Sequence, residues 1–281
     1  MSVVATVKVY DGIVLGAESM TQVTAVINGQ QQLIKSYEHA QKMFHVGKFP
    51  IGLLTYGIGN IGRRSIESFV HEFSRSETAL LAQPDQHVNV KETADRFFAF
   101  MQEHYSQAFG AMPTPQQPPL GFIVAGYSEA EHLASEWEFT LPQHSAPQPV
   151  RPQNEVGASW RGVGSPFSRL MFGFDPMLEP QLVQAGMPAQ EVQRFKNVAA
   201  GITTRIAFDG MPLRDAIGYC RFIIQTTIGW CTYAMGAAAC GGPIKLATIT
   251  RGADFEWITP PKPYVEGEKY GHKTAAYYHE Q

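Results

Sequence analysis

A hairpin signal near the start of the chain constrains the fold more than any other feature. Residues 3–9 and 13–17 are short runs rich in β-branched and apolar side chains, and Asp11-Gly12 stands between them. An Asp-Gly pair in this setting favours a tight turn that joins two antiparallel strands. We therefore expect the chain to begin with a β-hairpin.

The same kind of pattern recurs later in the sequence. Residues 42–57 are predicted to form two strands joined at Gly47-Lys48, and the apolar runs at 121–128 and 137–141 predict a further antiparallel pair. Hairpins, rather than strand–helix–strand crossovers, indicate antiparallel sheets. Together with the helices described next, they predict an α+β layered fold.

Several segments have the apolar spacing of amphipathic helices. Ile66, Phe69 and Phe73 fall on one face of a helix predicted over residues 63–75. Further helices are expected at 90–109, from Ser165-Pro166 onward, within 175–210 and over the apolar stretch 213–235, and closing strands at 244–250 and 255–259.

Composition and charge argue against some classes of protein. The chain has 281 residues, of which 44% are hydrophobic and 17% charged, and this suits a globular protein with a sizeable core. The formal net charge of -3 argues against a nucleic-acid binder, which usually carries a basic surplus. Because no apolar run is long enough to span a bilayer, we expect no membrane partner.

Cysteine usage bears on the cellular compartment, and histidine usage bears on metal binding. The three cysteines are too few for a disulfide framework, and none forms a CxxC pair. The N-terminus lacks the basic and apolar regions of a signal peptide, so we expect a cytoplasmic protein. The nine histidines are scattered without metal-ligand spacing, and we expect neither a metal site nor a cofactor.

Residues 57–62, GIGNIG, match the dinucleotide fingerprint G-x-G-x-x-G and lie between a predicted strand and a predicted helix. A nucleotide-binding protein is therefore one hypothesis. The fingerprint also needs a parallel strand that ends in an acidic residue about 20 residues later, and SETALLAQPDQHVNV offers no such strand. The alternative is a glycine-rich turn that presents a backbone N–H to an oxyanion.

The order of several motifs resembles a proteasome β-type subunit. The opening strand is followed by DGIVLGAES, QKMFHV and LTYGIGNIG, and later by RGVGSPFSRLM and ACGGPIKLATIT. The resemblance covers most of residues 2–251 and implies a single N-terminal-nucleophile (Ntn) hydrolase domain, a four-layer αββα sandwich with two antiparallel sheets. Compared with that family, the chain carries insertions near 22–36, 142–156 and 175–210 and a C-terminal tail at 260–281. Within the first insertion Asn28-Gly29 predicts a turn, and the four prolines of 142–156 predict an exposed excursion.

The resemblance also implies a set of catalytic residues. Ser2, exposed by removal of Met1, takes the position of the family's N-terminal nucleophile. Glu18 takes the family's acidic position, and Lys42 takes that of its catalytic lysine. The N–H of Gly57 would serve the oxyanion hole.

These residue types suit amide hydrolysis. A serine hydroxyl is a weak nucleophile that needs a base, and the α-amino group of Ser2, with a reference pKa of about 8, can accept its proton. A buried lysine beside a carboxylate stays charged, and its field lowers the pKa of the neighbouring hydroxyl and amine. Glu18 would then interrupt an apolar strand because it holds a cation.

Each assignment has an alternative without chemistry. A serine after the initiator methionine is common, so Ser2 alone carries little weight. Glu18 could be an exposed strand residue. Lys42 could be a solvated turn lysine, and Lys35 is a rival for its role.

The chain departs from the family at supporting positions. Val163, Ala237 and Cys240 stand where the family has a serine, an aspartate and a serine that hydrogen-bond to the amino terminus and the nucleophile. Valine and alanine side chains cannot do this, and a thiol is only a weak donor. Ser159, Ser165 or a bound water could substitute, and Cys240 is more simply a small buried core residue.

The positions that correspond to the first specificity pocket offer no charge for selecting acidic or basic substrate side chains; they are Thr21, Ala40, Phe44, Thr55 and Gly59. We expect a peptide or amide hydrolase that, like its relatives, assembles into a homo-oligomeric ring. Whether an ATPase partner feeds it does not follow from the sequence. The other hypothesis is a proteasome-like scaffold or binding protein without turnover.

Overall fold

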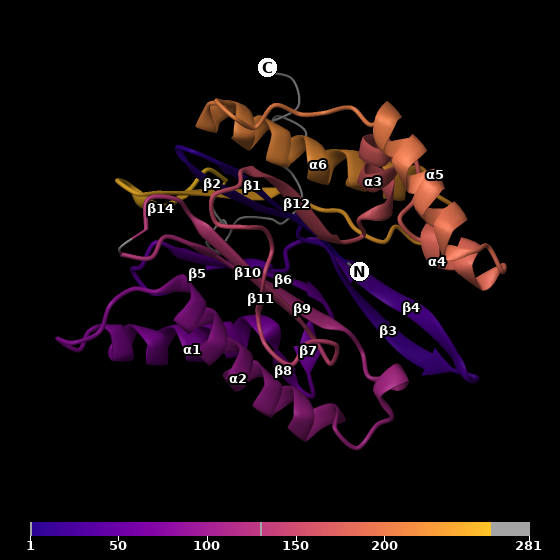
Figure 1. The fold of residues 1–281 in the computed structure, drawn as a ribbon. Helices are drawn as coiled ribbons and strands as arrows, with labels where there is room; N and C mark the ends of the chain where they lie inside the picture. The colour runs from indigo at the N-terminus through magenta and orange to yellow at the C-terminus, as the bar shows by residue number, and fades with distance from the viewer. Residues whose placement is uncertain (1, 130, 260–281) are drawn as a thin grey trace, which may run out of the picture.

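The computed structural model describes residues 2–129 and 131–259, and the tail predicted at 260–281 lies outside them. It has a mixed α+β fold with two five-stranded sheets and flanking helices (Figure 1). Every strand pairing recorded in this part of the chain is antiparallel. The prediction of an α+β fold with antiparallel sheets is therefore confirmed.

The first sheet has the strand order β12-β1-β2-β13-β14. It contains the hairpin that the Asp-Gly pair predicts, in which Val4 pairs with Ala17. The turn itself lies one residue earlier, at Tyr10-Asp11, because Gly12 already pairs with Val9. Strand β12 was not predicted, because GASWRG begins and ends with glycine and lacks a β-branched run. The strands span Val3–Val9 (β1), Gly12–Ala17 (β2), Gly157–Gly162 (β12), Lys245–Thr250 (β13) and Asp254–Trp257 (β14).

The second sheet has the strand order β11-β10-β9-β6-β5. Both predicted pairs are present, since Met43 pairs with Leu54 and Leu120 with Leu141. The strands span Met43–His45 (β5), Ile51–Gly57 (β6), Leu120–Gly126 (β9), Ser135–Leu141 (β10) and Gln148–Pro149 (β11).

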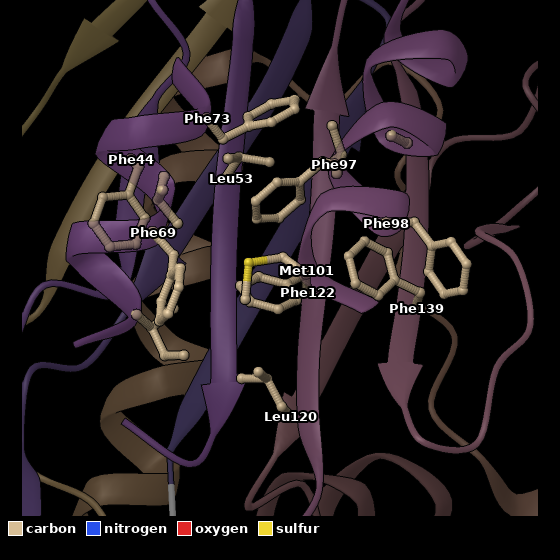
Figure 2. Close-up of a cluster of buried hydrophobic side chains, with 14 of the residues drawn as sticks. Phe44, Leu53, Phe69, Phe73, Phe97, Phe98, Met101, Leu120, Phe122 and Phe139 are labelled. Carbon is tan, nitrogen blue, oxygen red and sulfur yellow. The ribbon is translucent and has the colours of Figure 1, made fainter. Parts of the chain in front are cut away.

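Two helices, α1 (Ile66–Leu81) and α2 (Val90–Phe109), cover the outer face of the second sheet. Their apolar faces and the sheet enclose a core rich in aromatic rings (Figure 2). The ring of Phe97 lies with its centroid 4.8 Å from those of Phe73 and Phe122. These contacts join α1, α2 and β9 in one core.

Helix α1 starts and ends later than the predicted 63–75. The short strands β7 (Asn60–Ile61) and β8 (Arg64–Ser65) pair first, and the Ser65 side chain then caps the helix. The helix continues to Leu81 because further side chains on its inner face are buried. One of these buried side chains, Glu77, is charged, whereas the apolar spacing predicts only apolar side chains on this face.

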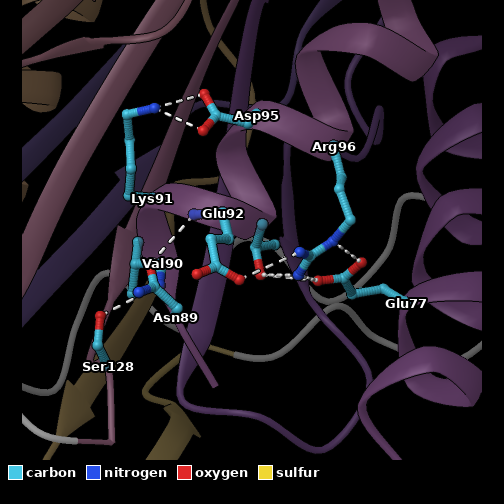
Figure 3. Close-up of polar contacts among 9 residues, drawn as sticks. Glu77, Asn89, Val90, Lys91, Glu92, Asp95, Arg96 and Ser128 are labelled. Carbon is cyan, nitrogen blue, oxygen red and sulfur yellow. Dashed lines mark hydrogen bonds and ion pairs between the residues drawn. The ribbon is translucent and has the colours of Figure 1, made fainter. Parts of the chain in front are cut away.

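Buried polar contacts also join α1 to α2 (Figure 3). The Glu77 carboxylate is 2% exposed and accepts hydrogen bonds from Arg96 at 2.6 and 3.0 Å and from the Thr93 hydroxyl at 2.7 Å. The side chain of Asn89 caps α2 by accepting the N–H of Glu92 at 3.1 Å. The two helices are thus held together by charge as well as by apolar packing.

On the outer face of the first sheet lie α6 (Leu213–Tyr233) and α3 (Ser165–Phe172), as predicted for these segments. The predicted helical content of 175–210 consists of α4 (Leu178–Gln184) and α5 (Ala189–Ile202). Both lie near α3 in Figure 1. The core under α6 contains the buried side chains of Val3, Ala5, Phe167 and Ile224 among others.

The facing surfaces of the two sheets form a third core, which combines Val4 and Leu15 with Met43 and Ile123. Part of this space is polar. Thr6 donates to Glu136 at 2.5 Å, Arg151 donates to the same carboxylate at 2.6 Å, and Arg151 also donates to Ser159 at 2.7 Å. We refer to Thr6, Glu136, Arg151 and Ser159 as the inter-sheet cluster.

The inter-sheet cluster corrects the prediction of an exposed excursion at 142–156. Strand β11 pairs with β10, and the Arg151 side chain is only 11% exposed. The segment therefore contributes a buried cation to the space between the sheets. The proline-rich composition indicated only that the chain does not form a helix here.

The insertion predicted near 22–36 forms a separate two-stranded ribbon, β3 (Thr21–Ile27) with β4 (Gln30–Tyr37). It extends away from the two sheets (Figure 1). The predicted turn is present at Asn28-Gly29, where φ is 53° and 76°. Positive φ at both residues is the geometry for which Asn-Gly is preferred.

The setting of GIGNIG contradicts the nucleotide hypothesis. The motif follows β6, and both recorded neighbours of β6 in its sheet, β5 and β9, run antiparallel to it. The dinucleotide fingerprint requires a parallel strand–helix–strand unit, so that its helix and second strand complete the site. The other interpretation of residues 57–62, a glycine-rich turn that presents a backbone N–H, stays a prediction.

Candidate active site

The four predicted catalytic residues lie at adjoining strand ends. Ser2 directly precedes β1 and Glu18 directly follows β2, and these strands pair antiparallel. Lys42 directly precedes β5 and Gly57 ends β6, which form the corresponding pair in the second sheet. Because antiparallel strands bring the start of one beside the end of the next, each pair of residues shares one sheet end.

An ion pair joins these two sheet ends. The Lys42 ammonium donates to Oε1 of Glu18 and to the carbonyl oxygen of Met20. The Glu18 side chain is fully buried and that of Lys42 is 8% exposed. Glu18 therefore interrupts an apolar run because it binds a cation from the other sheet, and it is not an exposed strand residue.

The second carboxylate oxygen of Glu18 is held by the backbone. Its Oε2 accepts the N–H of Met20 at 2.7 Å and the N–H of Gly241 at 3.1 Å. Hydrogen bonds to both oxygens compensate for the removal of a charged carboxylate from water. The carboxylate is thus fixed in place by three chain segments.

Burial lowers the pKa of the Lys42 ammonium, and the charge of Glu18 opposes this shift. An ammonium has three donors, and the bonds to Glu18 and Met20 account for two of them. The lowered pKa does not by itself mark a catalytic lysine, because burial also lowers the pKa of Lys8, which donates to the Gln153 carbonyl. What sets Lys42 apart is its place at the strand ends, with one donor left over. Lys35, the rival for this role, lies exposed on β4.

Ser2 is 4% exposed and its carbonyl oxygen accepts the N–H of Val163 at 2.7 Å. The next carbonyl, that of Val3, accepts the N–H of Glu18 at 3.2 Å. Ser2 therefore adjoins Val3, the residue whose backbone is hydrogen-bonded to Glu18, the acid that binds Lys42. This hydrogen bonding places the predicted nucleophile beside the ion pair at the level of the backbone.

The turn that holds Ser2 requires glycine. Gly162 has φ 83°, and a Cβ there would lie 1.8 Å from the Ser2 carbonyl oxygen. No side chain fits at that separation, and the φ value itself is strained for other residues. In RGVGSP, the backbone at Gly162 and Val163 therefore contacts Ser2, even though the valine has no polar side chain.

The proposed substitutes for the missing supporting groups are engaged elsewhere. The Ser159 hydroxyl accepts a hydrogen bond from Arg151, and the Ser165 hydroxyl donates to Asp175. Ala237 is exposed. Cys240 is fully buried, as its reading as a small core residue predicts, and its sulfur lies 3.5 Å from that of Cys231.

Gly57, the predicted oxyanion-hole residue, has a backbone that only glycine adopts readily. Its φ is 101°, and a Cβ there would lie 2.2 Å from the Pro119 carbonyl oxygen. Lys42 lies on the neighbouring strand end, because its carbonyl oxygen accepts the N–H of Thr55, two residues before Gly57. The glycine is thus required by the close approach of the chain at the start of β9.

Four of the five predicted pocket residues lie around these strand ends. Thr21 and Gly59 are neighbours, since a Cβ on Gly59 would be 3.4 Å from the Thr21 hydroxyl oxygen. Ala40 donates its N–H to the Ser19 carbonyl at 2.8 Å, and Thr55 pairs with Lys42. Phe44 differs: it is 4% exposed and belongs to the core beneath α1 and α2.

Sequence reasoning missed two residues that organise this site. The buried Ser19 hydroxyl lies 2.7 Å from the carbonyl oxygens of Glu38 and Pro243, so it ties together the segments that lead to Lys42 and to β13. Gly241 binds Glu18 through its N–H and Met20 through its carbonyl oxygen. The only signals were a serine after an acidic residue and a Gly-Gly pair, both common in loops.

The remaining observations assign no cofactor and no relative. Within residues 2–129 and 131–259, no group of histidine, cysteine, aspartate or glutamate side chains is arranged to hold a metal ion, and no helix there is long and apolar enough to cross a membrane. The chain matches neither a model of a known protein family nor a curated protein.

Proposed function

We propose that this chain is an N-terminal-nucleophile hydrolase, similar to a proteasome β-type subunit, that cleaves peptide or other amide bonds through Ser2. The observation that carries the proposal is the buried Lys42–Glu18 ion pair, which lies at the strand ends beside Ser2. Burying a lysine costs free energy that its partners only partly offset, and groups retained at such a cost are often found at functional sites.

The layering of the chain supports the same proposal. Helices α1 and α2 lie outside one sheet, helices α3 and α6 lie outside the other, and the two sheets face each other across a shared core. This order corresponds to the αββα sandwich that the resemblance implies. In such a fold the strand ends of the two inner layers are where Ser2 and Lys42 would meet.

The proposed reaction uses few groups. Removal of Met1 gives Ser2 a free α-amino group, which accepts the proton as the Ser2 hydroxyl oxygen attacks the substrate carbonyl carbon. Lys42 stabilises the developing negative charge, and the Gly57 N–H donates to the oxyanion. The amine then leaves with the proton, and water hydrolyses the resulting ester on Ser2.

A second candidate, a proteasome-like scaffold without turnover, is favoured by one observation. Val163 contacts Ser2 only through its backbone, and Ser159 and Ser165 have other partners. The side-chain support of the nucleophile expected in the family is therefore not matched. A homo-oligomeric ring and a peptide or amide substrate stay predictions under either candidate.

The test is covalent labelling of the purified full-length chain with a β-lactone, followed by intact mass and peptide mapping. The proposal predicts loss of Met1 and a single adduct on Ser2. The variant Ser2→Ala should give no adduct, whereas Ser168→Ala, a buried serine that accepts from Trp160, should label like the wild type.

A free Ser2 that stays unlabelled over long incubation would contradict the hydrolase and favour the scaffold. An adduct that persists in Ser2→Ala would contradict the assignment of the nucleophile. Retained Met1 would also count against turnover, because it leaves the α-amino group on the wrong residue.

A further inference from the structure

Two of the three cysteines are in contact next to the candidate active site. Cys231 lies in the last turn of α6, and Cys240 lies in the segment that leads from α6 to β13. Their sulfur atoms are 3.5 Å apart, and the two residues are 5% and 0% exposed. A disulfide has a sulfur–sulfur distance of about 2.05 Å, so the atoms need to approach by roughly 1.5 Å.

Cys240 also borders the residue that holds the Glu18 carboxylate. The next residue, Gly241, donates its N–H to Glu18 at 3.1 Å, and its carbonyl oxygen accepts the N–H groups of Ser19 and Met20 at 3.2 and 2.9 Å. The Cys240 thiol is within electrostatic range of both Glu18 and Lys42. Cys240 is therefore close both to Cys231 and to the ion pair.

We propose that Cys231 and Cys240 form a reversible intramolecular disulfide that loosens Gly241 from Glu18 and so lowers the activity of the site. Bond formation draws the Cys240 sulfur toward α6, away from the ion pair, and a 3.1 Å hydrogen bond weakens when its donor moves. The effect on turnover rests on the proposed function, whereas formation of the disulfide does not.

The oxidant that the proposal requires is a low-molecular-weight disulfide such as oxidised glutathione. One protein thiolate attacks it to give a mixed disulfide and one released thiol. The second protein thiolate then displaces the other glutathione. The two cysteines lose two electrons and two protons, and the oxidant becomes two thiols.

The burial of the two cysteines predicts under which conditions the disulfide forms slowly or faster. Burial raises the pKa of the Cys240 thiol, so little of it is thiolate in the folded chain. The linking residues Ala234, Met235 and Gly236 are exposed, and nothing approaches within 4 Å of a Cβ at Gly236. We expect oxidation through local opening of this segment, slow in buffer and faster in mild urea.

The experiment incubates the full-length protein with oxidised glutathione, with and without mild urea, and then unfolds it in N-ethylmaleimide. Intact mass should show a fall from three maleimide adducts to one, and peptide mapping should place the remaining adduct on Cys220. That cysteine is buried with its sulfur 3.8 Å from the Ala5 carbonyl oxygen, which makes it an internal control. Dithiothreitol should restore three adducts.

Hydrogen exchange then reads the effect on the site without any substrate. Amide exchange in a peptide that contains Ser19 and Met20 should become at least about tenfold faster in the oxidised protein, because their acceptor Gly241 has moved. The variant Cys231→Ser should show no change with oxidant, and Cys220→Ser should respond like the wild type. Labelling of Ser2 by the β-lactone should slow by a similar factor.

Three adducts at every oxidant and urea concentration, or glutathione left on one cysteine without closure, would overturn the proposal. A disulfide that leaves exchange at Ser19 and Met20 unchanged would overturn the link to the site. If Ser2 never labels in the reduced protein, the proposed function fails, while the mass and exchange data still decide this inference.

Discussion

Two buried carboxylates in this chain, Glu18 and Glu136, are matched in exposure and differ in their surroundings. Both side chains are fully buried, and their cations, Lys42 and Arg151, are 8% and 11% exposed. Glu18 joins the two sheets at the strand ends, whereas Glu136 joins them in the space between the sheets. Burial alone therefore does not separate a candidate catalytic pair from a structural one.

The cation makes the difference. Arg151 binds both Glu136 and Ser159 through its planar guanidinium, which stays charged under all ordinary conditions. Lys42 has a pKa lowered by burial and a donor that its two partners do not use. A buried lysine can change its charge or its partner during a reaction, and a forked arginine pair resists both.

The largest effect on stability is expected for Arg151→Met. Loss of the cation leaves the buried Glu136 carboxylate with the Thr6 hydroxyl as its remaining recorded hydrogen-bond donor and Lys8 as a nearby positive charge. We expect the free energy of unfolding to fall by about 3–5 kcal/mol. Urea denaturation measures this. The partly exposed pair Arg161–Glu138 is the matched control, and Arg161→Met should cost only about 1 kcal/mol. Equal losses would remove the distinction between the pairs.

The counterpart is Lys42→Met, whose main effect should be on chemistry. Glu18 keeps two backbone N–H bonds, so the loss of stability should be smaller, about 3 kcal/mol. The rate of Ser2 acylation by a β-lactone should fall by about 10²–10³-fold, because a charge near the reacting oxygen is lost. Lys35→Met, on the exposed ribbon, should label at the wild-type rate. Unchanged labelling in Lys42→Met would make both carboxylate pairs structural.

A smaller difference in unfolding free energy is expected between alanine variants of two glycines in GIGNIG. Gly57→Ala forces a Cβ to 2.2 Å from the Pro119 carbonyl oxygen at φ 101°, and should lower the free energy of unfolding by about 3 kcal/mol. Gly62→Ala has φ 58° and open space around the Cβ, so it should cost only about 1 kcal/mol. Thermal and urea denaturation of both variants measure the difference. Similar costs would show that positive φ, and not the close approach of the chain, makes Gly57 necessary.

The smallest effect is a dependence on pH. Because burial lowers the pKa of Lys42 in the folded chain, the unfolded chain binds more protons between that lowered pKa and 10.5. Stability contributed by this group therefore rises with pH through that window, by at most about 1.4 kcal/mol per pH unit, and is flat below it. The measurement is the unfolding free energy of wild type minus Lys42→Met from pH 7 to 10.5.

That difference cancels groups common to both proteins, such as the Cys240 thiol. A difference that falls with pH for Lys42→Met would mean that Glu18 raises the pKa of the lysine above its ordinary value. Lys42 would then resemble Arg151 in holding its charge firmly.

The sequence by itself determined the local elements of this protein. The Asn-Gly pair specified its turn, and the apolar spacing of 90–109 specified α2, because these signals act over a few residues. The Asp-Gly pair predicted the first hairpin, although its turn lies at Tyr10-Asp11. It also indicated Glu18 as an anomaly in an apolar run. Strand β12 had no such local signal, because it forms by pairing with β1, which is far away in the sequence. Nothing in the local sequence indicated that Arg151 is the cation of the inter-sheet cluster, because its partner Glu136 lies on another strand.

Only the tertiary structure decided which charges and thiols meet. Lys42 and Glu18 come from the strand ends of different sheets. Val163, about 160 residues later in the sequence, donates its N–H to Ser2, and Cys231 at the end of α6 contacts Cys240 in the segment that follows. Each contact exists because antiparallel pairing and the packing of two sheets bring separate strand ends together. Local patterns do not contain that information, since the free energy that fixes it comes from burying surfaces of the whole fold.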